Sequence, residues 1–273
     1  IEMQLAAVGF THPATLSAQF ANPATNRVHA QARLPALGIG DLAAVDEGQG
    51  QLVAVLLPQH AQLGCLGVFL GIADQFAGDA ADGDRHFGWG GLLMDGSDSL
   101  ADRARLFYHR RHGISPQHVQ IRTNFITKEN VNDLFTQYGF KGELDLLSID
   151  IDGVDWWIWD AVTVVSPRLV IIEFNASFGP TASVTVPYEP SFERYAHHES
   201  GWYHGASLAA FTKLAAKKGY FLAGCDTSGA NAIFVRRDVG QGKVAEFTPA
   251  EAFYPCAPRL REASLDEQWE RVK

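Results

Sequence analysis

The sequence predicts an α/β fold, in which a mostly parallel sheet has helices on both faces and ends in a C-terminal antiparallel hairpin. Short apolar runs alternate along the chain with segments whose apolar residues recur every three or four positions, and this alternation is typical of parallel sheets with helical connections. The apolar run 144–149 stops at a cluster of acidic residues, as a strand buried on both faces would. The last two apolar runs, 220–223 and 231–235, are joined by a link that suits a hairpin better than a crossover.

The composition narrows the class of protein. The chain has 273 residues, of which 47% are hydrophobic, enough for one large domain or two small ones. Its formal charge of −9 argues against a broad phosphate-binding surface, so we expect no nucleic-acid partner. No stretch approaches the roughly 20 apolar residues of a membrane span. The three cysteines lack metal-ligand spacing, which favours a reducing, cytoplasmic compartment. The sequence does not determine the oligomeric state, and a homo-oligomer is compatible with it.

We expect three parts: an N-terminal cap or extension over residues 1–63, the α/β domain over 64–240, and a C-terminal helical extension over 241–273. The first part is rich in Ala, Gln and Pro and has weak periodicity. Its apolar run 51–57 fits either a strand or a buried helical turn. The last part contains scattered apolar residues, which indicate a helical segment packed on the outside.

The elements of the first half are predicted from apolar runs and from the capping residues and glycines between them. A first strand is predicted at 67–72 and is followed by a loop; a second strand is predicted at 90–97. Ser99 and Asp102 have the spacing of a capping box, so a helix is predicted to begin there. It ends at Gly113, since glycine commonly follows the last turn of a helix.

The second half continues the alternation. A strand at 118–121 precedes a helix that Thr127 caps and Gly139 ends. The strand at 144–149 precedes a helix at 154–164. Three further elements complete the sequence of predictions: a strand at 169–175, a long loop at 176–205 and a helix at 206–218.

The long loop has the length of a lid or binding loop. Its histidines are candidate general bases: His197, His198 and His204. His204 is the preferred one because it stands beside the start of the following helix. The alternative for any of them is an ordinary solvated histidine.

Asp150, Asp152 and Asp155 follow the strand at 144–149 within six residues. Ligands of open α/β sheets bind outside the carboxyl ends of the strands, so these carboxylates occupy a position suited to chemistry. They repel one another unless a cation, a ligand hydroxyl or water lies between them. The alternative is structural: Asp152 or Asp155 caps the following helix.

Residues 145–155, with the run Ile149-Asp150-Ile151-Asp152-Gly153, resemble the strand-four signature of FkbM-like methyltransferases. The stretches 172–175, 178–180 and 205–208 strengthen the resemblance, which covers about residues 64–237. The resemblance implies a Rossmann-like class I methyltransferase sheet and S-adenosylmethionine as the cofactor.

The resemblance also implies roles for particular residues. Gly71 and Asp74 would hold the methionine part of the cofactor, and Asp95 would bind its ribose hydroxyls. Asp150 would face the methionine amino group or the methyl acceptor. The remaining residues expected around the cofactor are Gly96 and Ser97 after the second strand, and Asn124 and Phe125 beside the adenine.

Four polar residues at strand ends are candidate metal ligands: Asp150, Asp152, Glu173 and Asn175. Their oxygen atoms suit magnesium or calcium, and some sugar O-methyltransferases of this fold use such a metal. The alternative is that Glu173 and Asn175 shape the acceptor pocket through hydrogen bonds alone. The catalytic candidates are Asp150, Asp152 and His204.

The sequence therefore predicts a methyltransferase acting on oxygen in a small hydroxylated metabolite or sugar, which is its expected partner. Two alternatives stay open. Asp150 and Asp152 also form an Asp-x-Asp motif, as in metal-dependent nucleotide-sugar glycosyltransferases. The single glycine in the turn 71–76 instead favours a non-catalytic binding module with the same fold.

Overall fold

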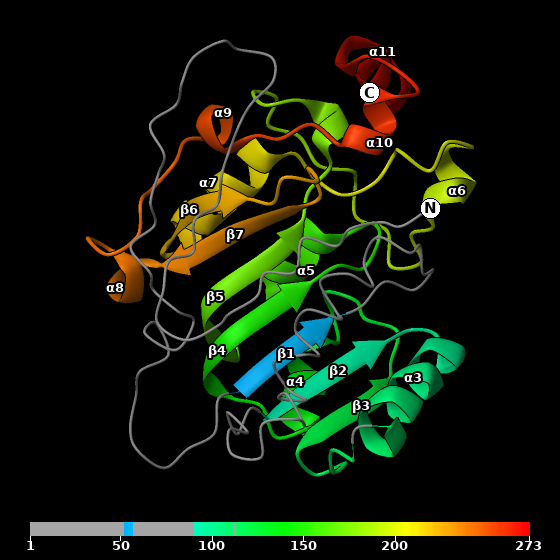
Figure 1. The fold of residues 1–273 in the computed structure, drawn as a ribbon, viewed down its shortest axis with the longest axis vertical. Helices are drawn as coiled ribbons and strands as arrows, with labels where there is room; N and C mark the ends of the chain where they lie inside the picture. Colours follow the sequence, from blue (N-terminus) through cyan, green and yellow to red (C-terminus); the bar gives the residue numbers. More distant parts are fainter. Residues whose placement is uncertain (1–51, 57–89, 112) are drawn as a thin grey trace.

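The computed structural model describes residues 52–56, 90–111 and 113–273. They form a seven-stranded sheet with the order β3-β2-β1-β4-β5-β7-β6 (Figure 1). Its strands are β1 (Leu52–Leu56), β2 (Gly90–Asp95), β3 (Val119–Thr123), β4 (Gly142–Ile149), β5 (Val165–Glu173), β6 (Tyr220–Cys225) and β7 (Asn231–Arg236). The strands from β3 to β5 are parallel, and β7 is antiparallel to both β5 and β6. The predicted mostly parallel sheet with a C-terminal antiparallel hairpin is confirmed.

Strand β1 lies inside the sheet, between β2 and β4. It comes from the run 51–57, which the sequence left open between strand and helical turn. The sheet thus includes part of the segment expected to form the N-terminal extension. The strand predicted at 67–72, with Gly71 and Asp74 after it, lies outside the described residues. Periodicity alone does not separate a short buried strand from a helical turn, so the strand at Leu52–Leu56 became clear only from its pairing with β2 and β4.

Helices cover both faces of the sheet, as predicted. They are α3 (Asp98–Arg105), which continues as the π-helix η1 (Leu106–Arg111), α4 (Val131–Gln137), α5 (Asp155–Ala161) and α7 (Leu208–Lys218). Successive residues of a strand point to opposite faces: Leu93 belongs to the buried cluster that contains residues of α3 and η1, whereas Leu92 belongs to the cluster that contains residues of α4, α5 and α7.

Several helix ends differ from the predictions. Ser97, rather than Ser99, precedes α3, and Asp102 pairs with Arg105 (2.7 Å) instead of closing a capping box. Asn130, rather than Thr127, is the N-cap residue of α4. Local spacing allows each of these alternatives, and the surrounding chain selects one.

Helix α5 ends at residue 161 and β5 begins at 165, so the expected helix 154–164 is shorter and the expected strand 169–175 starts earlier. Asn132 Oδ1 accepts hydrogen bonds from the N–H groups of Thr163 (2.8 Å) and Val164 (3.2 Å). A side chain from α4 thus satisfies backbone donors that would otherwise continue the helix.

The long loop returns across the carboxyl edge of the sheet. It contains the short helices η2 (Ala176–Phe178) and α6 (Arg194–His197). The Gly205 N–H donates to the Gly153 carbonyl oxygen at 2.7 Å, which ties the end of the loop to the turn after β4. Ser207 then caps α7 by accepting from the Ala210 N–H.

The chain ends in four short helices: α8 (Arg237–Gly240), α9 (Pro249–Ala252), α10 (Ala257–Leu260) and α11 (Leu265–Val272). Figure 1 shows α10 and α11 beyond the carboxyl ends of the parallel strands, and α11 packs against η2. Helices α9, α10 and α11 lie within residues 241–273. Within the described part of the chain, no helix has the length and apolarity needed to cross a bilayer.

Candidate functional site

Strand register places three acidic residues level with one another along the carboxyl edge of the sheet. Met94 and Ile149 both pair with Leu56, and Ile149 also pairs with Ile172. The next residues along their strands are acidic: Asp95, Asp150 and Glu173. Asp95 and Asp150 thus lie on either side of the end of β1, two strand spacings or roughly 10 Å apart.

The turn after β2 is organised by Asp95, whose side chain is buried. Its Oδ1 accepts a hydrogen bond from the Ser97 N–H at 2.6 Å, which leads the chain through Gly96 into α3. Its carbonyl oxygen accepts from the Asn124 N–H at 2.8 Å. Carboxylate oxygens accept hydrogen bonds from hydroxyl groups, which is the chemistry that a ribose ligand would require of Asp95.

Asn124 and Phe125 follow β3 at the same edge. Asn124 Oδ1 accepts from the Tyr138 hydroxyl at 2.7 Å, and the Phe125 side chain is 45% exposed. An exposed aromatic ring beside a buried carboxylate suits a ligand that has a flat ring and a sugar. The structure thus brings together the cofactor residues predicted at the ends of β2 and β3.

Asp150, Asp152 and Glu173 form a group that we call the carboxylate cluster, in which one oxygen of each lies within 4.8 Å of the others. Asp150 and Asp152 are buried. Burial, followed by the charges of Asp150 and Asp152, raises the pKa of Glu173 well above its usual value. The cluster is a place where added positive charge or a proton would be stabilised.

The turn that follows β4 presents Asp152 in a left-handed backbone conformation, with φ of 59°. Asp155 supports this turn by accepting from the N–H groups of Ile151 (2.9 Å) and Gly153 (3.1 Å). Burial raises the pKa of Asp155 to about 6. Val154 is the N-cap residue of α5 and makes no side-chain cap. Asp155 therefore has a structural role in the turn, whereas Asp152 belongs to the cluster.

Arg194, from α6 in the long loop, donates a hydrogen bond to Asp152 through Nη1. Its Nε donates to the Gly201 carbonyl oxygen at 2.7 Å, which fixes the direction of the guanidinium group. Arg194 thus supplies a positive charge to the carboxylate cluster. Its role could not be read from the local sequence, because its partner Asp152 lies 42 positions away.

Both polar atoms of the Asn175 side chain form hydrogen bonds within the protein. Its Nδ2 donates to the carbonyl oxygens of Trp202 (2.7 Å) and His204 (2.8 Å). Its Oδ1 accepts from the Ser177 N–H (3.0 Å) and from Arg259 Nη1 (2.7 Å). Both acceptor positions of this oxygen are therefore used, and we leave Asn175 out of the metal ligands.

His204 lies beside the carboxylate cluster and is 1% exposed. Its Nε2 bonds to Arg259 Nη2 at 2.8 Å, and its Nδ1 lies 3.7 Å from Glu173 Oε2. Burial, together with the charges of Arg194 and Arg259, lowers the pKa of His204 well below its usual value. Arg259 belongs to α10, so the extension predicted to pack on the outside contributes a buried contact to the site.

The other two loop histidines have separate contacts. His197 stacks on Phe192 with ring centroids 4.6 Å apart, and its Nε2 lies 3.1 Å from Glu189. His198 Nδ1 bonds to the Ser200 hydroxyl at 2.7 Å. Of the three candidate bases, His204 is the one for which the structure records a contact with the cluster.

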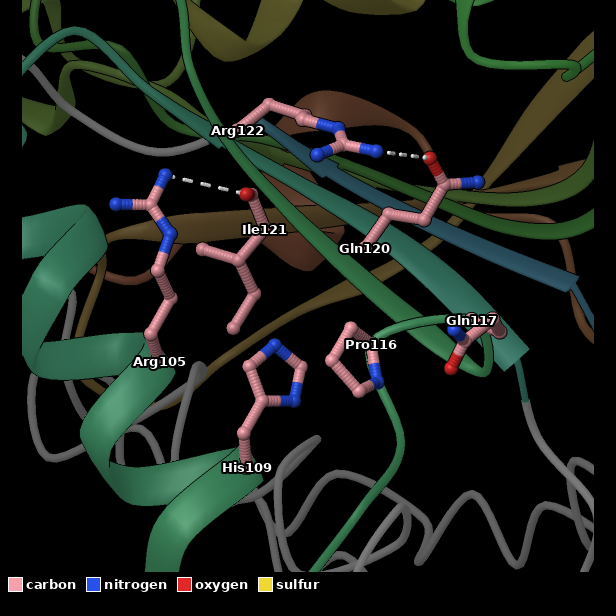
Figure 2. Close-up of a pocket in the computed structure, with 7 residues that line it drawn as sticks. All are labelled: Arg105, His109, Pro116, Gln117, Gln120, Ile121 and Arg122. Atoms are coloured by element: carbon pink, nitrogen blue, oxygen red, sulfur yellow. Dashed lines mark hydrogen bonds between the residues drawn. The ribbon is translucent and has the colours of Figure 1, made fainter.

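A cavity of about 530 Å³ lies elsewhere, along the edge strand β3 and beside η1. Figure 2 shows the residues that line it: Arg105, His109, Pro116, Gln117, Gln120, Ile121 and Arg122. Arg105 is held against the Ile121 carbonyl oxygen at 3.2 Å. None of the site residues predicted from the sequence lines this cavity.

The chain has an α/β fold whose sheet is parallel from β3 to β5, with β7 antiparallel to β5. No protein-family model matches it, and no curated protein sequence matches it. One similar solved structure is an O-methyltransferase family protein from Burkholderia thailandensis, with 15% sequence identity and a TM-score of 0.40. The match covers 72% of this chain and 55% of that chain, so this chain corresponds to about half of the longer protein.

Proposed function

We propose that the protein is an S-adenosylmethionine-dependent methyltransferase that methylates an oxygen of a small hydroxylated metabolite or sugar. The observation that carries the proposal is that Asp95 and Asp150 lie at the same register position, on either side of the end of β1. Asp95 would accept from the ribose hydroxyls, with Gly96 and Ser97 in the turn beside it. Asn124 and Phe125 would flank the adenine.

The bound cofactor supplies an activated methyl group for an in-line displacement. The residues of this chain would orient the acceptor and remove its proton, the two tasks that such a transfer requires. The carboxylate cluster adjoins the proposed cofactor side at Asp150. Glu173 suits the role of proton acceptor because burial and neighbouring charges raise its pKa, which brings a carboxylate closer to the working pH.

In an alternative arrangement, Asp150, Asp152 and Glu173 would instead hold a divalent cation such as Mg²⁺. Mg²⁺ takes oxygen ligands at about 2.1 Å, so oxygens on opposite sides of the ion are about 4.2 Å apart, compatible with a cluster whose atoms lie within 4.8 Å. Arg194 already offsets part of the charge at Asp152. Calorimetric titration with Mg²⁺ tests this assignment. Glu173→Gln should abolish the heat, whereas the control Asp160→Asn, beside Lys217, should retain it.

Calorimetry with S-adenosylmethionine and S-adenosylhomocysteine tests the proposed function directly. We expect both to bind, and we expect Asp95→Ala to abolish the heat while the circular dichroism spectrum is unchanged. Absence of heat with both compounds would refute the proposal. Heat with uridine diphosphate and Mn²⁺ instead would favour the glycosyltransferase, and binding without turnover on any hydroxylated acceptor would favour the binding module.

A further inference from the structure

We infer that Arg259 is a positioning residue that holds His204 as the tautomer with its proton on Nδ1, so that the ring presents an N–H group to Glu173. The inference deepens the proposed function and rests on it for its consequence in methyl transfer. The hydrogen-bond pattern itself is a property of the free protein.

The first step is the contact between Arg259 Nη2 and His204 Nε2 at 2.8 Å. A guanidinium group carries only donors and stays charged in proteins. His204 Nε2 must therefore be the acceptor, which means that it carries no proton. A neutral imidazole has one N–H group, so the proton is on Nδ1.

The second step is the direction of that N–H group. Nδ1 has no hydrogen-bond partner among the described residues, and His204 is almost completely shielded from solvent. The carboxylate oxygen Glu173 Oε2 lies 3.7 Å from Nδ1. This distance is beyond a hydrogen bond, and a shift of less than about 1 Å would bring the pair into the 2.7–2.9 Å range of charge-assisted bonds.

The third step is that both partners of the contact are held in place. Arg259 Nη1 donates to Asn175 Oδ1 (2.7 Å) and to the Ser177 hydroxyl (2.9 Å). The Ser177 hydroxyl donates in turn to Gln268 of α11 at 2.8 Å. The His204 carbonyl oxygen accepts from Asn175 Nδ2. The C-terminal helices thus fix the guanidinium group, and Asn175 fixes the backbone of the histidine.

This arrangement changes the role expected for His204. One ring nitrogen accepts from Arg259 and the other carries a proton, so the ring has no lone pair left to remove a proton from an acceptor hydroxyl. His204 instead donates toward Glu173 and stabilises its ionised form. Proton removal then falls to the carboxylate cluster, with Arg259 and His204 holding Glu173 in position.

Nitrogen-15 NMR of the full chain labelled at histidine tests the tautomer, with the His204 signals assigned by their loss in His204→Gln. We expect an unprotonated Nε2 and a protonated Nδ1 in the unmodified protein. Arg259→Met should remove this preference, Arg259→Lys should retain it in part, and the control Arg261→Met, at an exposed position of the same segment, should leave it unchanged. A proton on Nε2 in the unmodified protein would overturn the inference, even if Arg259→Met fails to fold.

Kinetics add a separate readout. In a folded Arg259→Met variant we expect kcat to fall about 10- to 100-fold, as is typical when a partner that orients a functional group is lost, with S-adenosylmethionine affinity unchanged. An unchanged kcat would show that the tautomer has no part in the reaction. If the unmodified protein transfers no methyl group, the proposed function fails, and the NMR result still decides the tautomer.

Discussion

Asp152 and Arg194 form an ion pair in which both side chains are buried, with 5% and 9% of their surface exposed. Arg194→Met would remove a buried positive charge from beside Asp152 in the carboxylate cluster. Removal of one partner of a buried pair costs about 3–5 kcal/mol. We therefore expect a loss of unfolding free energy of this size in urea denaturation without added metal. The double variant with Asp152→Asn should recover part of it, and strict additivity of the two effects would contradict the pairing.

Asp152→Asn should lower turnover more than cofactor affinity. Asparagine tolerates the left-handed backbone conformation of this position, so the turn should persist while the carboxylate is lost. Comparison of kcat with the dissociation constant of S-adenosylmethionine checks this expectation. Unchanged turnover would assign Asp152 a structural role.

Asp95→Asn is the conservative test of the ribose contact. The amide keeps an acceptor for the Ser97 N–H, whereas it loses one acceptor position for ligand hydroxyls. A hydrogen bond to a charged group contributes about 1.5–3 kcal/mol, so we expect about 10- to 100-fold weaker cofactor binding by calorimetry. Asp98→Asn, at an exposed position in the first turn of α3, is the matched control. Equal affinity of the two variants for S-adenosylmethionine would show that Asp95 does not contact the ribose.

The titration of Asp155 predicts a pH dependence of stability. Its pKa in the folded protein is about 6, raised mainly by burial from a reference value of 3.8. Between these values the folded state binds more protons than the unfolded state, so stability falls as pH rises. At 1.36 kcal/mol per pH unit, the contribution lost between about pH 4 and 6 is about 3 kcal/mol.

Urea denaturation of the unmodified protein and of Asp155→Asn measures this contribution. As pH rises from 4 to 6, the unfolding free energy of the unmodified protein should fall relative to that of Asp155→Asn. Above pH 7 the difference should be constant. A difference that is constant across the whole range would show that Asp155 titrates at its ordinary value.

Gly153→Ala should destabilise the turn after β4. A Cβ atom at this position would lie 2.3 Å from the Phe192 ring, closer than any carbon contact permits. Overpacking of this kind costs about 1–3 kcal/mol. The smaller side chain in Phe192→Leu should relieve part of the loss in the double variant, as thermal unfolding would show. Absence of any relief would mean that the long loop does not lie over this turn.

Much of the fold was predictable because it depends on local pattern. Apolar runs that end in acids at Asp95, Asp150 and Glu173 predicted parallel strands whose carboxyl ends share one edge. The link between β6 and β7 predicted their antiparallel pairing. These features depend on which residues can be buried in an element of a given period, and that information is contained in a few neighbouring positions.

The chemistry of the site depended on contacts between distant positions. Arg194 pairs with a residue 42 positions away, and Arg259 with Asn175 at a separation of 84. The sequence by itself determined most strands of the sheet and the acids at its edge, whereas the place of β1 within the sheet came from the tertiary structure. Only the tertiary structure decided which arginines pair with these acids and which nitrogen of His204 carries the proton. It also showed that the side-chain oxygen and nitrogen of Asn175 are both occupied by hydrogen bonds within the protein. The reason is that hydrogen bonds depend on atomic positions, which the packing of the whole chain creates.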